Sequence, residues 1–173
     1  MDVLLQVLAF LICSALGYIK AYDYTCRVNN LKSFIFVLKY LEDEIIYRKS
    51  ALPDAIATVS QHKASNAAKF FLEQVACNMN KDTEFLDLYE VWKDSVTSLK
   101  SKNYMEDKDI EVILELGKSL GNSDTTGQEL LFTRIGKMLN DLLQEAQEMS
   151  ATKGKMYKGL GIAAGLILVI LLV

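Results

Sequence analysis

The chain has very few of the residues on which catalytic and metal sites depend. Histidine occurs once, at His62, and the three cysteines form no CxxC pair. Two-histidine zinc sites are therefore excluded, a single histidine gives little basis for assembling a catalytic triad, and no GxxxxGK[ST] or GxGxxG phosphate loop occurs. We expect a protein that is not an enzyme and that has no cofactor and no metal site. A membrane-tethered hydrolase built on His62 and nearby carboxylates is the least favoured alternative.

Other shortages exclude further classes of protein. A single proline rules out collagen-like and proline-rich chains, and an apolar content of 51% rules out intrinsic disorder. A net charge of −3 and a pI near 5.3 leave no basic excess to neutralise phosphates, so we expect no nucleic-acid partner. The odd number of cysteines argues against a disulfide framework and suits a reducing compartment.

Both ends of the chain lack charge. All 19 lysines and arginines and every acidic residue except Asp2 lie between Lys20 and Lys158. The apolar runs from Val3 to Ile19 and from Gly159 to Val173 would be roughly 25 Å and 22 Å long as helices, and interfacial side chains at their ends extend this reach. We therefore predict transmembrane helices over residues 1–20 and 158–173, with a helical domain over residues 21–157 between them.

The charges next to the two runs predict the orientation of the chain. Basic residues lie only on the inner flanks, at Lys20, Arg27, Lys32, Lys153, Lys155 and Lys158. By the positive-inside rule, the central domain is expected in the cytoplasm and both termini on the far side of the membrane. A cleaved signal peptide is the alternative for the first run, but that run is preceded by Asp2 and no basic residue, and no A-x-A site follows it.

Apolar residues recur at helical spacing throughout the central domain, and no strand-like alternation persists. This pattern predicts an all-α fold, a bundle of six helices joined by short connections. One helix continues from the first span along Leu31, Phe34, Leu38, Leu41 and Ile45. A second starts after Ser50, which is expected to be its N-cap, with Pro53 in its first turn. The others cover Asn66–Asn80, Glu84–Lys100, a segment from Glu106 to Gly121, and a segment that begins after Ser123 and leads to the second span.

The most distinctive stretch is LGKSLGNSDTTGQ, which runs from Leu116 to Gln128. Gly121 is placed to stop one helix in a left-handed conformation. Ser123 and Asp124 are typical of a helix start, and Gln128 is placed to face back towards it. We expect this corner to fix the angle between two helices and to expose amides that can bind a partner's carboxylate.

Two further features are candidates for contacts with other helices or proteins. Glu42 and Glu44 lie off the apolar stripe of their helix, so they belong either to a solvated face or to a partner-docking face. Gly161 and Gly165 form a GxxxG pattern inside the second apolar run, where a neighbouring helix can approach closely. That helix is either the first span or a second copy of the chain.

The corner resembles a known family when it is taken with LEDEI at Leu41–Ile45, LPDA at Leu52–Ala55 and the two apolar ends. Members of the stage III sporulation protein AB family of endospore-forming bacteria show a similar LGxSD corner followed by glutamine, a similar LExEI helix and the same two-span frame. The resemblance covers essentially the whole chain. The positions that match the family's motifs are Glu42, Glu44, Pro53, Gly117, Gly121, Ser123, Asp124 and Gln128.

The resemblance implies a part of the channel apparatus that joins mother cell and forespore during engulfment. The family is similar to the inner-membrane platform proteins of type II secretion and type IV pilus machines, although only one bundle is present here. It implies contact with the bilayer, with a cytoplasmic secretion-type ATPase of the same operon, with other channel subunits and with further copies of the chain. The partner-binding residues would be Glu42, Glu44, Asp124 and Gln128. A membrane-anchored helical adaptor or signalling protein with a different partner is the alternative.

Overall fold

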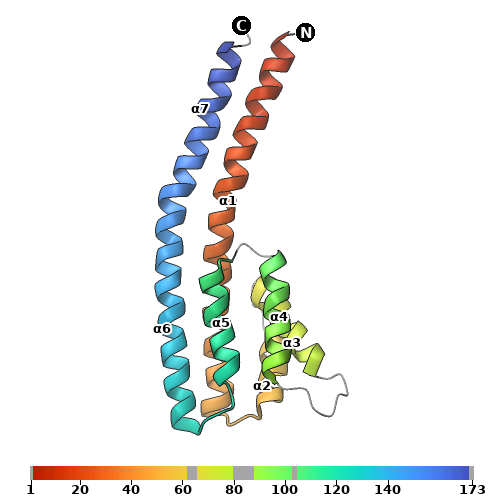
Figure 1. Ribbon diagram of the computed structural model, residues 1–173, viewed down its shortest axis with the longest axis vertical. Coiled ribbons are helices and arrows are strands. Elements are labelled where there is room, and N and C mark those ends of the chain that lie inside the picture. The colour runs from red at the N-terminus through yellow and green to blue at the C-terminus, as the bar shows by residue number, and fades with distance from the viewer. Residues whose placement is uncertain (1, 62–65, 80–87, 103–104, 172–173) are drawn as a thin grey trace. The chain divides into compact units, whose positions relative to one another are not determined.

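The computed structural model describes residues 2–61, 66–79, 88–102 and 105–171, and its regular elements are helices (Figure 1). In chain order they are α1 (Asp2–Glu42), η1 (Asp43–Tyr47), α2 (Leu52–Ser60), α3 (Asn66–Met79), α4 (Leu88–Lys102), α5 (Asp107–Ser119), α6 (Thr125–Met149), η2 (Ser150–Gly154) and α7 (Lys155–Leu171). No strand occurs among the described residues, which confirms the predicted all-α class. His62, and residues 84–87 of the helix predicted from Glu84, lie outside the described residues.

The helices divide into two compact units, which are described separately. Unit 1 comprises Met1–Val28 and Gln144–Val173, and unit 2 comprises Asn29–Leu143. Helices α1 and α6 contribute to both units, whereas η2 and α7 belong to unit 1 alone. Unit 2 therefore contains all or part of the six helices α1 to α6, in agreement with the predicted six-helix bundle.

The core of unit 2 is centred on Trp92 of α4, which is 1% exposed. Its ring meets Phe71 of α3 edge-on with the centroids 4.9 Å apart, a favourable geometry for two aromatic rings. Its Nε1 donates a hydrogen bond of 2.8 Å to the Ile113 carbonyl of α5, which satisfies the polar atom of the buried indole. The sequence assigns Gly117 to the corner, but this residue lies inside α5, where a Cβ would overlap the indole of Trp92.

The end of α1 departs from the helical pattern that the sequence predicts. Leu31, Leu38 and Leu41 are buried as expected, but the next turn is the π-helix η1, in which Arg48 N donates to Asp43 O at 3.1 Å. A π-turn holds one more residue than an α-turn, so it rotates the side chains that follow. Glu44 stands at the start of this turn, seven residues after the buried Val37 and three after the buried Leu41, and it is itself buried at 6% exposure, whereas Ile45 is only half-buried.

The N-cap of α2 lies one residue after the predicted one. The N-cap is Ala51 in an extended conformation, so the prediction that Ser50 caps this helix is wrong. The Ser50 hydroxyl instead donates to Glu44 Oε2 at 2.9 Å. Pro53 lies in the first turn, where its missing N–H leaves no helical hydrogen bond unmade.

In unit 1, α1 and α7 lie side by side (Figure 1) and approach each other through glycines. A Cβ on Gly17 would lie 2.7 Å from Tyr157 O and 2.9 Å from Gly161 Cα, so the two backbones are in contact at this level. Gly161 and Gly165 are both buried against α1. The π-helix η2 precedes α7 without a break in the helical chain.

Candidate docking site at the α5–α6 corner

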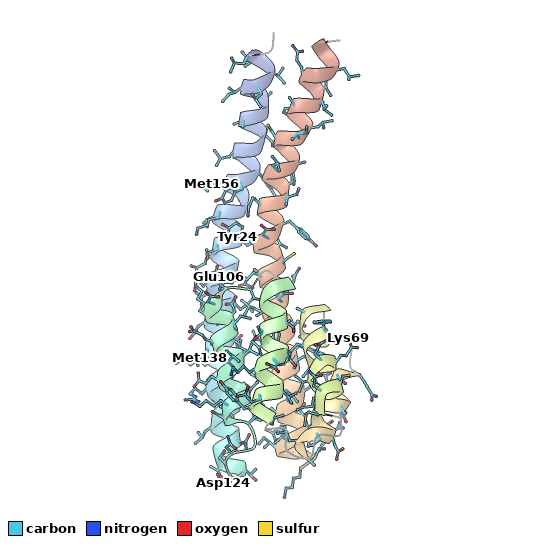
Figure 2. The ribbon with its side chains drawn as sticks, turned by 45° about the vertical axis from the view of Figure 1, so that its right-hand side comes forward. Tyr24, Lys69, Glu106, Asp124, Met138 and Met156 are labelled. Carbon is cyan, nitrogen blue, oxygen red and sulfur yellow. The ribbon has the colours of Figure 1, made fainter. Side chains whose placement is uncertain are left out.

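The corner between α5 and α6 is built by local capping interactions. Leu120 ends α5, and Gly121 follows with a φ of 79°, the left-handed conformation that its lack of a Cβ permits. Asp124 precedes α6: its Oδ1 accepts a hydrogen bond of 2.9 Å from Gly127 N, and its carbonyl accepts one of 2.9 Å from Gln128 N. Figure 2 shows Asp124 at this end of α6. The predicted glycine stop and Ser-Asp start are both present.

Gln128 is the buried polar residue of the corner, with 4% of its surface exposed. Its Nε2 donates to Ser123 Oγ at 3.0 Å and to Ser119 O at 3.4 Å, so the side chain faces back as predicted. Because a carbonyl oxygen can only accept, the Ser119 contact assigns the nitrogen to this side of the amide. Oε1 lies on the other side and accepts no hydrogen bond from any residue that the structure describes.

A pocket of about 190 Å³ lies beside this corner in unit 2. It is lined by Gly121, Ser123, Thr125 and Gln128 from the corner and α6, and by Ile45, Ile46 and Leu52 from η1 and α2. Three of the residues predicted from the sequence thus come together in one pocket. Pro53 does not line it, although its neighbour Leu52 does.

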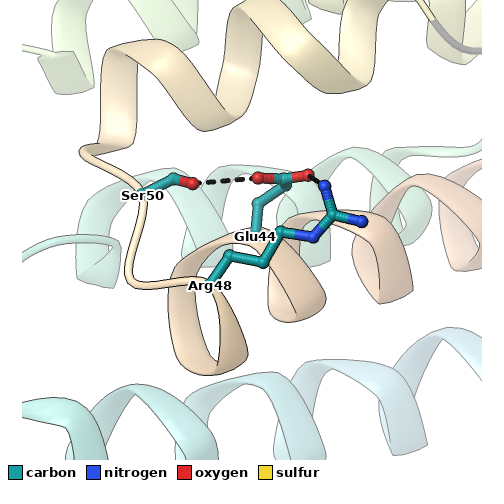
Figure 3. A network of polar contacts seen from close by, with 3 residues as sticks. All are labelled: Glu44, Arg48 and Ser50. Carbon is teal, nitrogen blue, oxygen red and sulfur yellow. Dashed lines mark hydrogen bonds and ion pairs between the residues drawn. The ribbon is translucent and has the colours of Figure 1, made fainter.

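Glu44 does not belong to an exposed docking face. Figure 3 shows its carboxylate between two donors: Arg48 Nη1 donates to Oε1 at 2.9 Å, and the Ser50 hydroxyl donates to Oε2 at 2.9 Å. The Glu44 carbonyl also accepts from Ser50 N at 2.9 Å. The prediction that Glu44 lies on a face not needed by the core is therefore wrong, because Glu44 lies on the same buried side of the helix as Val37 and Leu41, where it stabilises the end of the helix.

Glu42 is half-buried and has other acids close by. Burial raises the pKa of its carboxyl above the ordinary value of 4.5, the negative charges of Asp43 and Glu129 raise it further, and Lys39 lowers it in part. The sequence gives no sign of the approach of Glu129, because this residue follows Glu42 by 87 positions and comes from α6. Only the tertiary packing of α1 against α6 within unit 2 brings the two charges together.

No group of three or more histidine, cysteine or acidic side chains able to hold a metal is found among the described residues. Cys13 and Cys26 are half-buried and Cys77 is exposed, and all three are free thiols. The pocket beside the corner combines the apolar side chains of Ile45, Ile46 and Leu52 with the polar side chains of Ser123, Thr125 and Gln128.

The chain also has two helical stretches, Gln6–Tyr47 and Thr125–Leu171, that are long and apolar enough to cross a membrane. With the bundle of unit 2, they define a membrane-associated helical protein. The chain belongs to the stage III sporulation protein AB family, whose family model matches residues 2–173. It is therefore a sporulation protein.

Two relatives illustrate this membership. The stage III sporulation protein AB of Bacillus subtilis (strain 168) is 25% identical over 156 residues, which cover 90% of each chain. A solved structure of a stage III sporulation protein AB (SpoIIIAB) matches with a TM-score of 0.64 and 18% identity, over 72% of this chain and 96% of that one. At this identity the structural match shows a shared fold.

Proposed function

We propose that the protein is a non-enzymatic assembly platform in the inner membrane, part of the secretion-like channel between mother cell and forespore. In this role it docks a cytoplasmic secretion-type ATPase encoded in the same operon. The observation that carries the proposal is the combination of family membership with a compact helical bundle placed, in the sequence, between two apolar helices. A platform needs a membrane anchor and a protein-binding surface, and the apolar helices and the bundle are suited to these two roles.

The proposed topology places the termini on one side of the membrane and the bundle in the cytoplasm. Lys20, Lys153, Lys155 and Lys158 are all exposed in unit 1, next to the apolar ends of α1 and α7. The Lys158 ammonium lies 5.4 Å from the centre of the Tyr18 ring, so both side chains suit a membrane–water interface. The close glycine contact of α1 with α7 supports insertion of the two helices as a pair.

Native Cys77 offers a direct test of the topology, because it is exposed on α3 and Cys13 and Cys26 can be replaced by serine. An impermeant maleimide should label Cys77 in lysed cells and leave it unlabelled in intact mother cells. A matched variant with its single cysteine at the exposed residue Leu4 should be labelled in intact cells as well as in lysed cells. Labelling of Cys77 without lysis would contradict the cytoplasmic bundle and, with it, any cytoplasmic ATPase partner.

The docking function is tested by purification of the full chain, in mild detergent, from sporulating cells. The ATPase of the same operon should co-purify and should be lost at high salt if charge sets the contact. Replacement of the ATPase by an unrelated protein in the eluate would instead support the membrane-anchored adaptor. A deletion strain should arrest at engulfment, and re-expression of the chain should restore spore counts.

A further inference from the structure

The pocket beside the corner combines an apolar wall with oxygen acceptors. Ile45, Ile46 and Leu52 form the wall, and Gln128 and Ser123 supply polar lining atoms. A cavity of about 150 Å³ is large enough to hold a benzene molecule, so a pocket of about 190 Å³ admits one long side chain. A side chain that fills this pocket would place its aliphatic part on the apolar wall, and its terminal group would need hydrogen-bond donors for the oxygen acceptors.

Two carboxylates lie about one helical turn from residues that line this pocket. Glu42 precedes Ile45 and Ile46 by about one turn, and Glu129 follows Thr125 by one turn of α6. The two carboxylates are close enough for Glu129 to raise the pKa of Glu42. Their mutual repulsion is unfavourable in the protein alone, and a positive charge between them would relieve it.

Gln128 gives an independent indication of the same chemistry. It is 96% buried, its nitrogen is held by Ser119 and Ser123, and its Oε1 accepts no hydrogen bond from the described residues. A buried acceptor without a donor is costly, so a ligand that brings an N–H group is favoured. An anion is not favoured at this start of α6, because the Asp124 carboxylate already caps it.

We propose that this pocket receives one arginine side chain of the protein partner. The methylene stem lies on Ile45, Ile46 and Leu52, and the guanidinium donates to Gln128 Oε1 and to the carboxylates of Glu42 and Glu129. Arginine fits better than lysine, because its planar group carries five N–H donors that can serve several acceptors at once. The inference rests on the proposed function only for the identity of the partner, the ATPase.

The test uses the full chain in lipid nanodiscs with ¹³C-labelled isoleucine methyl groups. The probes are N-acetyl-arginine methylamide and the citrulline analogue, which has a similar shape without the charge. The arginine probe should shift the Ile45 and Ile46 signals in a saturable way, and citrulline should leave them almost unmoved. Equal shifts with citrulline would overturn the proposal, and equal binding of the lysine analogue would overturn the choice of arginine.

Two double variants separate this site from general surface charge. Glu42→Gln with Glu129→Gln should weaken arginine binding roughly tenfold, as expected when two close charges are removed. The control is Glu111→Gln with Asp141→Asn, which removes two carboxylates from another groove of unit 2, of about 360 Å³, and should change the affinity less than twofold. An equal loss in both double variants would refute a specific site. Glu44 is kept because it stabilises the end of α1.

A third variant tests the buried amide. Gln128→Leu keeps the size of the side chain and removes the acceptor, so it should weaken arginine binding while the isoleucine spectrum shows a folded corner. Arginine binding to the protein without ATPase co-purification would contradict the proposed function and leave the pocket intact. ATPase co-purification that survives the Glu42 and Glu129 double variant unchanged would overturn the pocket as the docking point.

Discussion

The two units of this chain pack by different means. In unit 1, α1 and α7 meet backbone against backbone at Gly17 and Gly161. In unit 2 large side chains interlock, and Gly117 leaves room for the indole of Trp92. Helices surrounded by lipid gain little free energy from burying apolar side chains, so they associate through close approach of their backbones. Helices in water associate by burying apolar side chains.

The largest expected effect is in unit 2, at the contact between Gly117 and Trp92. Gly117→Ala should lower the free energy of unfolding by roughly 2–3 kcal/mol, because the added methyl overlaps a fully enclosed ring. Trp92 is the only tryptophan, so its fluorescence during urea unfolding reports the change directly. Gly136→Ala is the matched control, since its Cβ would lie 3.6 Å from Leu38 Cδ2, an ordinary contact.

The glycine contact of unit 1 should respond differently. Gly161→Val places side-chain atoms against Cys13 O and Gly17, and two helices in lipid can separate, so we expect the axes to move apart by about 1–2 Å. Spin labels at the exposed residues Leu8 and Leu168 would measure this by electron–electron distance spectroscopy in nanodiscs. Gly159→Val is the control, because no atom lies within 4 Å of its Cβ. An unchanged distance would show that the close approach is not required.

A smaller effect is expected at the corner, where the backbone rather than packing sets the residue type. Gly121→Val should cost roughly 1–2 kcal/mol, because a β-branched residue is forced to a φ near 79°. Gly121→Asn should cost less, since asparagine tolerates the left-handed region. Urea unfolding followed by Trp92 fluorescence distinguishes the two, and equal stability of the valine variant would mean that the corner relaxes.

The smallest effect is electrostatic and depends on pH. Because burial beside Asp43 and Glu129 raises the folded-state pKa of Glu42 above its unfolded value, the ionised carboxyl opposes folding at neutral pH. That loss is relieved as the pH falls through the raised pKa, so Glu42→Gln should raise the Tm slightly at pH 7.5. The gain should disappear near the ordinary carboxyl pKa of 4.5, and a gain that is constant with pH would contradict this account.

The parts of the fold that could be predicted are those that depend on local signals. Three such features depend only on residues that are close in the sequence: the apolar stripe through Leu31, Leu38 and Leu41, the helix stop at Gly121 and the cap at Asp124. The burial of Glu44 was missed because the predicted stripe left out Val37, which is buried on the same side of α1 seven residues earlier. The approach of Glu129 to Glu42 was missed for a different reason, since the two residues are distant in the sequence.

The function of Gly117 shows the same limit. A glycine inside a predicted helix near a corner was interpreted as part of the corner, because the sequence does not indicate which side chain lies above it. Trp92 precedes Gly117 by 25 residues. It belongs to α4, which a connection separates from α5. Only tertiary packing places an indole against this glycine.

The π-helix η2 determines which residues of its helix face α1 in unit 1. Met149 accepts a hydrogen bond of 3.6 Å from Arg27 of α1 at its sulfur, and Gly154, five positions later, lies 3.9 Å from Ala21 O through its Cβ position. In a uniform α-helix, residues five apart point about 140° away from each other. The wider turn of η2 brings both residues towards α1. The extra residue in this turn therefore lets Met149 and Gly154 contact α1 from the same side of one continuous helix.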